Sequence, residues 1–159
     1  MSAVGDREPT IDLVRAHDVE DLLALMRAYC DFYEVSPSDA ALRALTGELL
    51  ANPERAGEQL IARDAAGGAV GFATLYWSWD TLEAGRIGVM NDLYVVPDAR
   101  GAGLAERLIA ACLQRCAARG AVRMYWETAS DNARAQRVYD RVGGEREASI
   151  VYSLPVPAV

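Results

Sequence analysis

The chain has 159 residues, of which 52% are hydrophobic and 25% are charged, as is typical of one globular domain. Its 16 basic residues are all arginine, and 23 acidic residues bring the net charge to −7. Residues 1–90 carry a net charge of −8 and residues 91–159 a net charge of +1, which argues against the clustered basic face that nucleic acid requires. The longest uncharged run, residues 65–79, is too short to cross a membrane. We therefore expect a single domain over residues 1–159, frayed over 1–9, that binds neither nucleic acid nor a membrane.

The cysteines indicate a reducing compartment. Cys30, Cys112 and Cys116 are odd in number and lack the spacing of a disulfide framework, and no secretory signal pattern opens the chain. Cys112 and Cys116 are four residues apart on an expected helix, without a histidine or a further cysteine nearby. We expect them to be small core residues, with no metal site. The expected location is the cytoplasm.

Apolar spacing and turn signals predict ten elements in the order β-α-α-β-β-β-α-β-α-β. The six strands are expected over residues 10–15, 59–63, 69–79, 86–96, 122–128 and 148–154. The four helices are expected after a cap at Asp18, over residues 38–51 with a cap at Ser38, and over residues 101–119 and 132–142. Consecutive strands joined by short turns should pair antiparallel, whereas the long helix between the fourth and fifth strands should make those two parallel neighbours. The predicted class is α+β with a mostly antiparallel sheet.

A glycine-rich turn joins the fourth strand to the helix that follows it. Residues 95–105 read Val-Val-Pro-Asp-Ala-Arg-Gly-Ala-Gly-Leu-Ala. Such a junction leaves backbone N–H groups at the positive end of the helix dipole with little side-chain bulk in the way, which suits a phosphate. Arg100 can add a charge-assisted contact. The turn is neither a P-loop nor a dinucleotide-binding motif, and a turn without a ligand is the alternative interpretation of these residues alone.

The turn and a later segment together resemble a known family. Arg100, Gly103 and Ala105 match the signature Gln/Arg-x-x-Gly-x-Gly/Ala of the GNAT superfamily of acyl-CoA-dependent N-acetyltransferases. The later segment is similar to the superfamily's second motif at five positions, which are Asn132, Ala135, Val138, Tyr139 and Gly143. Gly144 departs from the pattern, since Phe or Ala is usual there. The order of elements also fits that fold from residue 10 to residue 154.

The resemblance implies a GNAT-like sheet that splays between its fourth and fifth strands, with acetyl-CoA as the acyl donor in the gap and no metal. The amide-rich pantetheine arm would pair with the open strand edge near Val95, and the pyrophosphate would lie on residues 100–105. Asn132 is expected beside the pantetheine arm and Tyr139 near the thioester sulfur. The expected CoA-binding residues are Leu93, Val95, Val96, Arg100, Gly101, Ala102, Gly103, Leu104, Ala105, Asn132, Ala135 and Tyr139.

Acetyl transfer to an amine requires a base, an oxyanion donor and an acid for the leaving thiolate. The resemblance makes the Val95 N–H the oxyanion donor and the Tyr139 phenol the general acid, with packing as the alternative role of Tyr139. In the polyamine-acetyltransferase branch a carboxylate stands at the position of Asn91, which is no useful base. Asp92 would point to the other side of an ideal strand. We expect either a bulge that turns Asp92 inward as the base, or a water relay to Glu127 or to an acid of the first helices.

The acidic half of the chain predicts a cationic acceptor. Residues 31–58 carry a net charge of −4 and would cover the acceptor site in this fold, where aromatic rings can add cation–π contacts. Residues 75–79 and 151–152 are also similar to the polyamine and histone-type branch. We expect a small cationic primary amine, such as a polyamine or a lysine-like amine, that attacks directly in a ternary complex. The alternatives are a non-catalytic acyl-CoA-binding module and a protein or peptide N-acetyltransferase. An apolar strand edge at residues 150–152 favours a homodimer. The expected acceptor-binding residues are Tyr33, Glu34, Trp77, Asn91 and Glu127.

Overall fold

The computed structural model describes residues 8–158, which form two compact units that meet in sequence between Glu127 and Thr128. Of the segment expected to fray, only residues 8 and 9 are described, and the expectation of one domain stays a prediction. Among the described residues, no helix is both long enough and apolar enough to cross a membrane.

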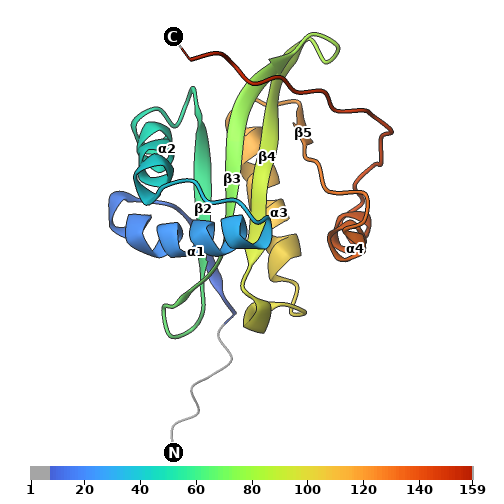
Figure 1. The fold of residues 1–159 in the computed structure, drawn as a ribbon. Coiled ribbons are helices and arrows are strands. Elements are labelled where there is room, and N and C mark those ends of the chain that lie inside the picture. Colours follow the sequence, from blue (N-terminus) through green and yellow to red (C-terminus); the bar gives the residue numbers. More distant parts are fainter. Residues whose placement is uncertain (1–7, 159) are drawn as a thin grey trace, which may run out of the picture. The chain divides into compact units, whose positions relative to one another are not determined.

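The first unit is built on a mixed sheet of five described strands (Figure 1). They lie side by side in chain order as β1 (Thr10–Leu13), β2 (Gly57–Arg63), β3 (Ala69–Asp80), β4 (Gly85–Val95) and β5 (Arg123–Tyr125). All neighbours pair antiparallel except β4 and β5, which are parallel. The α+β class, the antiparallel meander and the parallel pair are confirmed. β5 is shorter than the strand expected over residues 122–128.

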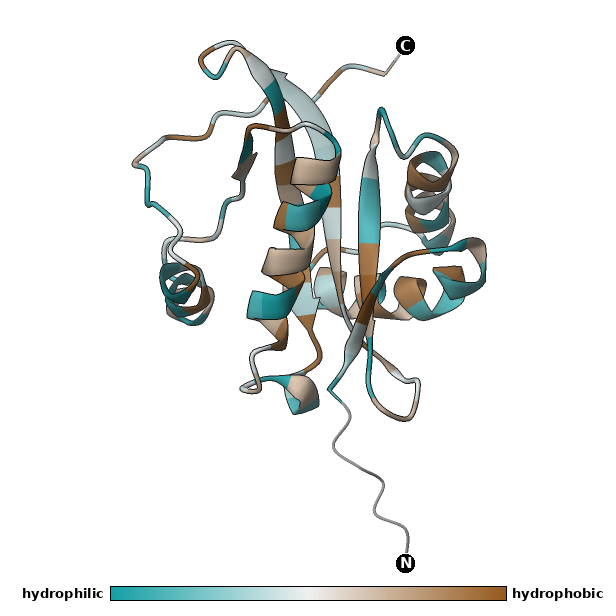
Figure 2. Ribbon diagram, turned by 180° about the vertical axis from the view of Figure 1, so that it is seen from behind, coloured by the Kyte–Doolittle hydropathy of each residue, from teal (hydrophilic) through white to brown (hydrophobic). Residues whose placement is uncertain are grey.

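Three α-helices cover the two faces of this sheet. The helices α1 (Val19–Phe32) and α2 (Asp39–Ala51) lie on one face, and α3 (Leu104–Ala118) lies on the other, as the two opposite views show (Figures 1 and 2). Under α1 the sheet contributes Ile61 and Phe72 to the buried core. The opposite face is so closely packed that a Cβ atom on Gly71 would lie 3.4 Å from Leu108 of α3.

The two predicted caps have different outcomes. Ser38 caps α2, because its Oγ accepts a hydrogen bond of 3.1 Å from the Ala41 N–H. Asp18 stands at the predicted N-cap position of α1, but its side chain makes no capping hydrogen bond to that helix. A short 3₁₀ turn precedes that helix, and the Asp18 carboxylate instead accepts from the Arg15 N–H at 2.9 Å and pairs with Arg63 at 2.6 Å.

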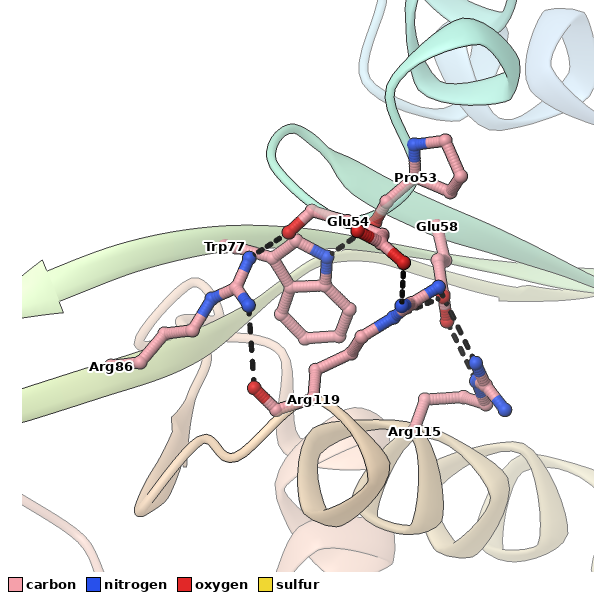
Figure 3. Close-up of polar contacts among 7 residues, drawn as sticks. All are labelled: Pro53, Glu54, Glu58, Trp77, Arg86, Arg115 and Arg119. Carbon is pink, nitrogen blue, oxygen red and sulfur yellow. Dashed lines mark hydrogen bonds and ion pairs between the residues drawn. The ribbon is translucent and has the colours of Figure 1, made fainter.

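A buried ion pair fastens α3 to β2 (Figure 3). The Glu58 side chain is only 3% exposed, and its two oxygens accept from Arg115 Nε at 2.7 Å and from Arg119 Nη2 at 2.6 Å. Burial raises the pKa of Glu58, but the hydrogen bonds from Arg115 and Arg119 lower it by more, so the net shift is downward. Glu58 is therefore ionised, and both of its oxygens pair with the arginines that hold α3 to β2.

The sheet opens between its last two strands. The β4–β5 pairing covers only Ile87 to Val89, opposite Arg123 to Tyr125, whereas β4 continues to Val95. Residues 90–95 of β4 therefore have a strand partner on the β3 side alone. The predicted splay between the fourth and fifth strands is confirmed.

The second unit contains α4 (Ala133–Arg141), which begins after Asn132. The sixth strand, expected over residues 148–154, is wrong: the structure has no helix or strand over the described residues 145–158. The alternating apolar side chains of that stretch, such as Ile150 and Tyr152, are exposed. A strand needs a partner for its backbone N–H and C=O groups, and sequence alternation alone does not provide one. The homodimer expected from this stretch stays a prediction.

Candidate active site

Asp92 lies at a bulge in β4. It is the cross-strand partner of Thr74 on β3, and the register then skips Asn91, which is the extra residue of the bulge. The hydroxyl groups of Thr74 and of Tyr29 on α1 lie close enough to the Asp92 carboxylate to favour its ionised form. Asn91 Nδ2 donates to Asp92 Oδ1 at 3.0 Å. The bulge therefore turns Asp92 toward the α1 face of the sheet.

The surroundings of Asp92 make it a stronger base than an ordinary aspartate. Burial raises its pKa by more than the hydrogen bonds from Thr74, Tyr29 and Asn91 lower it. A carboxyl group with a raised pKa accepts a proton more readily once it is ionised. Such a shift suits a group that takes a proton near neutral pH.

Tyrosine rings surround this carboxylate. The Tyr29 ring lies 4.9 Å from that of Tyr33 and 6.3 Å from that of Tyr94, measured between centroids. Burial, and then the charge of Asp92, raise the pKa of Tyr76 to about 12. The same two causes raise the pKa of Tyr29 strongly. The phenols of Tyr29 and Tyr76 are therefore protonated at neutral pH and can donate hydrogen bonds beside Asp92.

Of the five residues expected to bind the acceptor, the structure brings Tyr33 and Asn91 to the Asp92 cluster. Glu34 follows Tyr33 directly, with a left-handed backbone (φ +56°). Trp77 lies three residues after Thr74 and so on the opposite face of β3, where Nε1 donates to the Pro53 carbonyl at 2.8 Å. The Trp77 side chain packs on that opposite face of the sheet and is not part of the Asp92 cluster. Glu127 is exposed in the segment after β5.

The backbone of β4 presents the expected oxyanion donor at the open edge. The Val96 N–H donates to the Val70 carbonyl of the β3 side at 2.9 Å, and N–H directions alternate along a strand. The Val95 N–H therefore points away from β3, as does that of Leu93. Arg100 Nε donates to the Val95 carbonyl at 2.7 Å, so the Arg100 guanidinium lies at the same edge.

The expected phosphate turn has the geometry that its glycines predicted. Gly101 and Gly103 have left-handed backbones (φ +85° and +78°), and a Cβ atom on either would have no heavy atom within 4 Å. Gly103 is the N-cap of α3, so the first N–H groups of that helix have no partners within the helix. Ala102 is exposed, Leu104 is buried and Ala105 lies partly exposed in the first turn. Open space, small residues and helix N–H groups that make no bonds within the helix fit a phosphate group at this turn.

The remaining predicted site residues belong to the second unit. Asn132 Oδ1 caps α4 by accepting from the Ala135 N–H at 3.1 Å, which leaves its amide nitrogen as the group that can donate to a ligand. Tyr139 lies on the second turn of α4 and is partly buried. The roles expected for Asn132, Ala135 and Tyr139 stay predictions.

Prediction from the sequence missed Thr74 and Gln59, whereas Tyr29 and Tyr76 are among the aromatic residues expected near the acceptor. Thr74 and Gln59 are polar residues within otherwise apolar strands, and that is the signal that could have identified them.

The comparisons with known proteins agree with this geometry. The family model described as "Acetyltransferase (GNAT) family" matches residues 22–144. The uncharacterized N-acetyltransferase YhfO of Bacillus subtilis is 29% identical over 145 residues, which are 91% of this chain and 95% of that protein. An L-methionine sulfoximine/L-methionine sulfone acetyltransferase of Pseudomonas aeruginosa is 37% identical over 86 residues, and the match spans about half of either chain.

Solved structures show the same fold. The crystal structure of a protein described as a probable acetyltransferase has a TM-score of 0.81 and 27% identity, and the match covers 94% of this chain and 99% of that one. The aminoglycoside N-acetyltransferase AAC(6')-Iy, in complex with a bisubstrate analogue, has a TM-score of 0.83 at 23% identity over 94% of this chain and all of that one. Since the family model covers more than half of the sequence, the chain belongs to the GNAT family of acetyltransferases.

Proposed function

We propose that the chain transfers the acetyl group of acetyl-CoA to the primary amine of a small cationic acceptor, by direct attack in a ternary complex. The observation that carries this proposal is the Asp92 carboxylate, which lies among tyrosines on the strand whose far end forms the open edge and the phosphate turn. A base beside an acyl-CoA site is what transfer to an amine requires.

The acceptor class is inferred from the charge and the rings around Asp92. An ionised carboxylate beside Tyr29, whose ring lies 4.9 Å from that of Tyr33, suits an ammonium group through an ion pair and cation–π contacts. Glu34 would add a second negative charge at the end of α1, and Asn91 a polar contact. Among the similar proteins, one acetylates an aminoglycoside and another L-methionine sulfoximine or sulfone, by their names. Polyamines and lysine-like amines carry the same reacting group and are the acceptors that we propose.

CoA would be held by the elements named by the family motifs. The open edge at Val95 and Leu93 offers backbone groups to the amides of the pantetheine arm, and the turn from Arg100 to Ala105 offers N–H groups to the pyrophosphate. Asn132 of the second unit is proposed to donate to the pantetheine arm.

In the proposed mechanism each group moves one proton or stabilises one charge. Asp92 takes a proton from the ammonium group, directly or through a water molecule, and frees the nitrogen lone pair to attack the thioester carbon. The Val95 N–H donates to the oxyanion that forms. When the carbon–sulfur bond breaks, Tyr139 gives its proton to the thiolate and recovers one from the amide nitrogen. The products are the N-acetylated amine, CoA with a free thiol, and a proton that Asp92 releases.

The test is thiol release from acetyl-CoA by the pure protein with a panel of polyamines, amino acids, aminoglycosides and peptides. Turnover should be fastest with small di- and polyamines. Asp92→Asn and Tyr139→Phe should each lower turnover by roughly 10²–10⁴-fold while CoA still binds. Asp12→Asn, an exposed carboxylate on β1, is the matched control and should keep full activity. Preferential turnover of peptides would overturn the acceptor class, and full activity of Asp92→Asn would remove Asp92 as the base.

The three cysteines are free and buried. This state fits a reducing compartment, and we propose the cytoplasm.

A further inference from the structure

A row of polar side chains crosses the middle of the sheet. Gln59 on β2, Thr74 on β3 and Asp92 on β4 are successive cross-strand partners, so their side chains project from the same face. Gln59 is 4% exposed and Thr74 is fully buried. Their neighbours on that face, Ile61 and Phe72, are buried apolar residues. Buried polar groups destabilise the fold unless they are hydrogen bonded, so apolar side chains would serve packing better at both positions.

The hydrogen bonds along this row run in one direction. Gln59 Nε2 can only donate, and it donates to Thr74 Oγ1 at 3.2 Å. The Thr74 hydroxyl has one hydrogen left to donate, and Asp92 is its direct cross-strand partner, whose ionised form Thr74 favours. An ionised carboxylate only accepts, so the donating Gln59 amide and the Asp92 carboxylate orient the Thr74 hydroxyl in the same direction.

The surroundings of Gln59 hold its amide in the donating orientation. Nε2 also lies 3.5 Å from the Met26 sulfur on α1, to which Thr46 of α2 donates at 3.9 Å. Gln59 Oε1 is buried, and within the described part of the chain it has no hydrogen-bond partner. The opposite orientation would offer Oε1 to the Thr74 hydroxyl, whose single hydrogen would then turn away from Asp92. The observed arrangement leaves Gln59 Oε1 without a partner among the described residues, and it leaves the hydrogen of the Thr74 hydroxyl available to Asp92.

We propose that Gln59 is a positioning residue of the acetyltransferase site: by donating to Thr74, it directs the Thr74 hydroxyl at Asp92 and fixes the orientation of that carboxylate. Gln59 does not touch the substrate. The proposal rests on the proposed function, in which Asp92 is the base.

The other groups that face Asp92 do not replace this donor. Tyr29 approaches from α1, Tyr76 from β3 and Asn91 from β4, and none of the three is charged near neutral pH. The nearby cation Arg100 is engaged by the Val95 carbonyl and lies over the Tyr94 ring. Thr74 is therefore one of three polar neighbours, with Tyr29 and Asn91, that favour the ionised form of Asp92.

The test measures Asp92 directly, by ¹³C NMR titration of the carboxyl groups in the free protein, with Asp92 assigned from the Asp92→Asn spectrum. Thr74→Val should move the Asp92 titration to higher pH, whereas Thr74→Ser, which keeps the hydroxyl, should leave it in place. Gln59→Leu should also move it upward. Gln59→Glu should move it further, because a carboxylate at this position would accept from Thr74 and repel Asp92.

A double-mutant cycle separates positioning from a general packing effect. If Gln59 acts through Thr74, Gln59→Leu should produce no further shift in a Thr74→Val background. In the acetyl-transfer assay, Thr74→Val should lower kcat/KM roughly tenfold at pH values on the acid limb of the profile and should change it little on the plateau. Thermal unfolding checks that each variant is folded.

The outcomes distinguish this proposal from the proposed function. An Asp92 titration that stays unchanged in both Gln59→Leu and Thr74→Val overturns the positioning role, as does a Gln59→Leu shift that persists in full in the Thr74→Val background. Should Gln59→Leu not fold, Gln59→Glu alone decides, since an unmoved titration there contradicts the proposal. A titration that moves as expected while the kinetic profile does not would support the role of Gln59 and remove Asp92 as the base.

Discussion

The phenol of Tyr29 on α1 lies beside the carboxylate of Asp92 on β4 and lowers the pKa of that carboxylate. The Tyr29 ring is held edge-on against Phe72 at 5.8 Å and against Tyr94 at 6.3 Å, between centroids. These contacts fix the position of the hydroxyl, so the first helix takes part in setting the state of a carboxylate that is distant in the sequence. Removing the hydroxyl should therefore change Asp92 without changing the fold.

Tyr29→Phe keeps the ring contacts and removes one donor to Asp92. Since hydrogen bonds to the ionised form lower the pKa of Asp92, losing one should raise it further above the ordinary value. The base acts only when ionised, so the acid limb of the kcat/KM profile should move to higher pH. At pH values on the acid limb kcat/KM should fall roughly tenfold, with little change on the plateau. Tyr152→Phe, at an exposed tyrosine, should leave the profile in place, and an unmoved limb in Tyr29→Phe would contradict the hydrogen bond.

Asn91→Asp tests whether the side chain at the bulge residue 91 faces Asp92. The Asn91 amide donates to Asp92 Oδ1 at 3.0 Å, and the substitution would replace this donor with a second carboxylate. Two like charges at this distance disfavour each other's ionised forms. The acid limb should move to higher pH in Asn91→Asp, by more than in Asn91→Ala, which only removes the donor. Equal shifts in the two variants would show that the residue 91 side chain does not face Asp92.

Gly103→Ala tests the phosphate turn. The left-handed backbone of Gly103 costs alanine about 1–2 kcal/mol, although a Cβ atom there would have no heavy atom within 4 Å. The turn should shift, and CoA should bind roughly 5- to 30-fold more weakly. Gly67→Ala is the matched control, because Gly67 has a similar backbone (φ +85°) and equally open space in the turn between β2 and β3.

Calorimetric titration with CoA and urea unfolding of both variants separate the two effects. Both variants should lose a similar amount of stability, and only Gly103→Ala should lose CoA affinity. The same affinity in both variants would place the phosphate elsewhere.

The contrast between predicted and missed features follows from the range of the interactions involved. The strands of the meander and the turn at Gly101 and Gly103 were predictable, because periodicity and glycine preference are local properties. A bulge that turns Asp92 inward was one of two expected alternatives, because the pairing of β4 with β3 that places it at Asn91 is not specified by any local pattern. Trp77 was expected at the acceptor site together with residues of the Asp92 cluster. It lies one residue from Tyr76 along the strand, so its side chain projects from the opposite face of the sheet. The unpaired segment at residues 148–154 fails for the same reason, since alternation indicates which residues share a face but not whether a partner strand exists.

The buried carboxylate of Glu58 pairs with Arg115 of α3 and with Arg119, the residue that follows the end of that helix (Figure 3). Glu58→Gln keeps the shape of the side chain but leaves Arg115 and Arg119 without the anion that they share. Arg119 keeps its second pair, with Glu54 at 3.4 Å, so Arg115 is the guanidinium that loses its anion completely. Breaking a buried pair in this way should lower the free energy of unfolding by about 3 kcal/mol at pH 7, the low end of the usual range, because both guanidinium groups are partly exposed. Glu20→Gln is the control, since Glu20 pairs with Arg43 at the surface and its loss should change stability little.

The pH dependence of this difference identifies its origin. The pKa of Glu58 lies below its ordinary value of 4.5, because the hydrogen bonds from Arg115 and Arg119 outweigh the effect of burial. Its contribution is therefore complete above the ordinary value and is lost as the pH falls through the lower pKa of the folded state. Urea unfolding from pH 7 to pH 3 should show a constant gap between the native protein and Glu58→Gln down to about pH 5, and a narrowing gap below pH 4. A gap that stays constant to pH 3 would mean that the substitution acts through packing and not through the charge of Glu58.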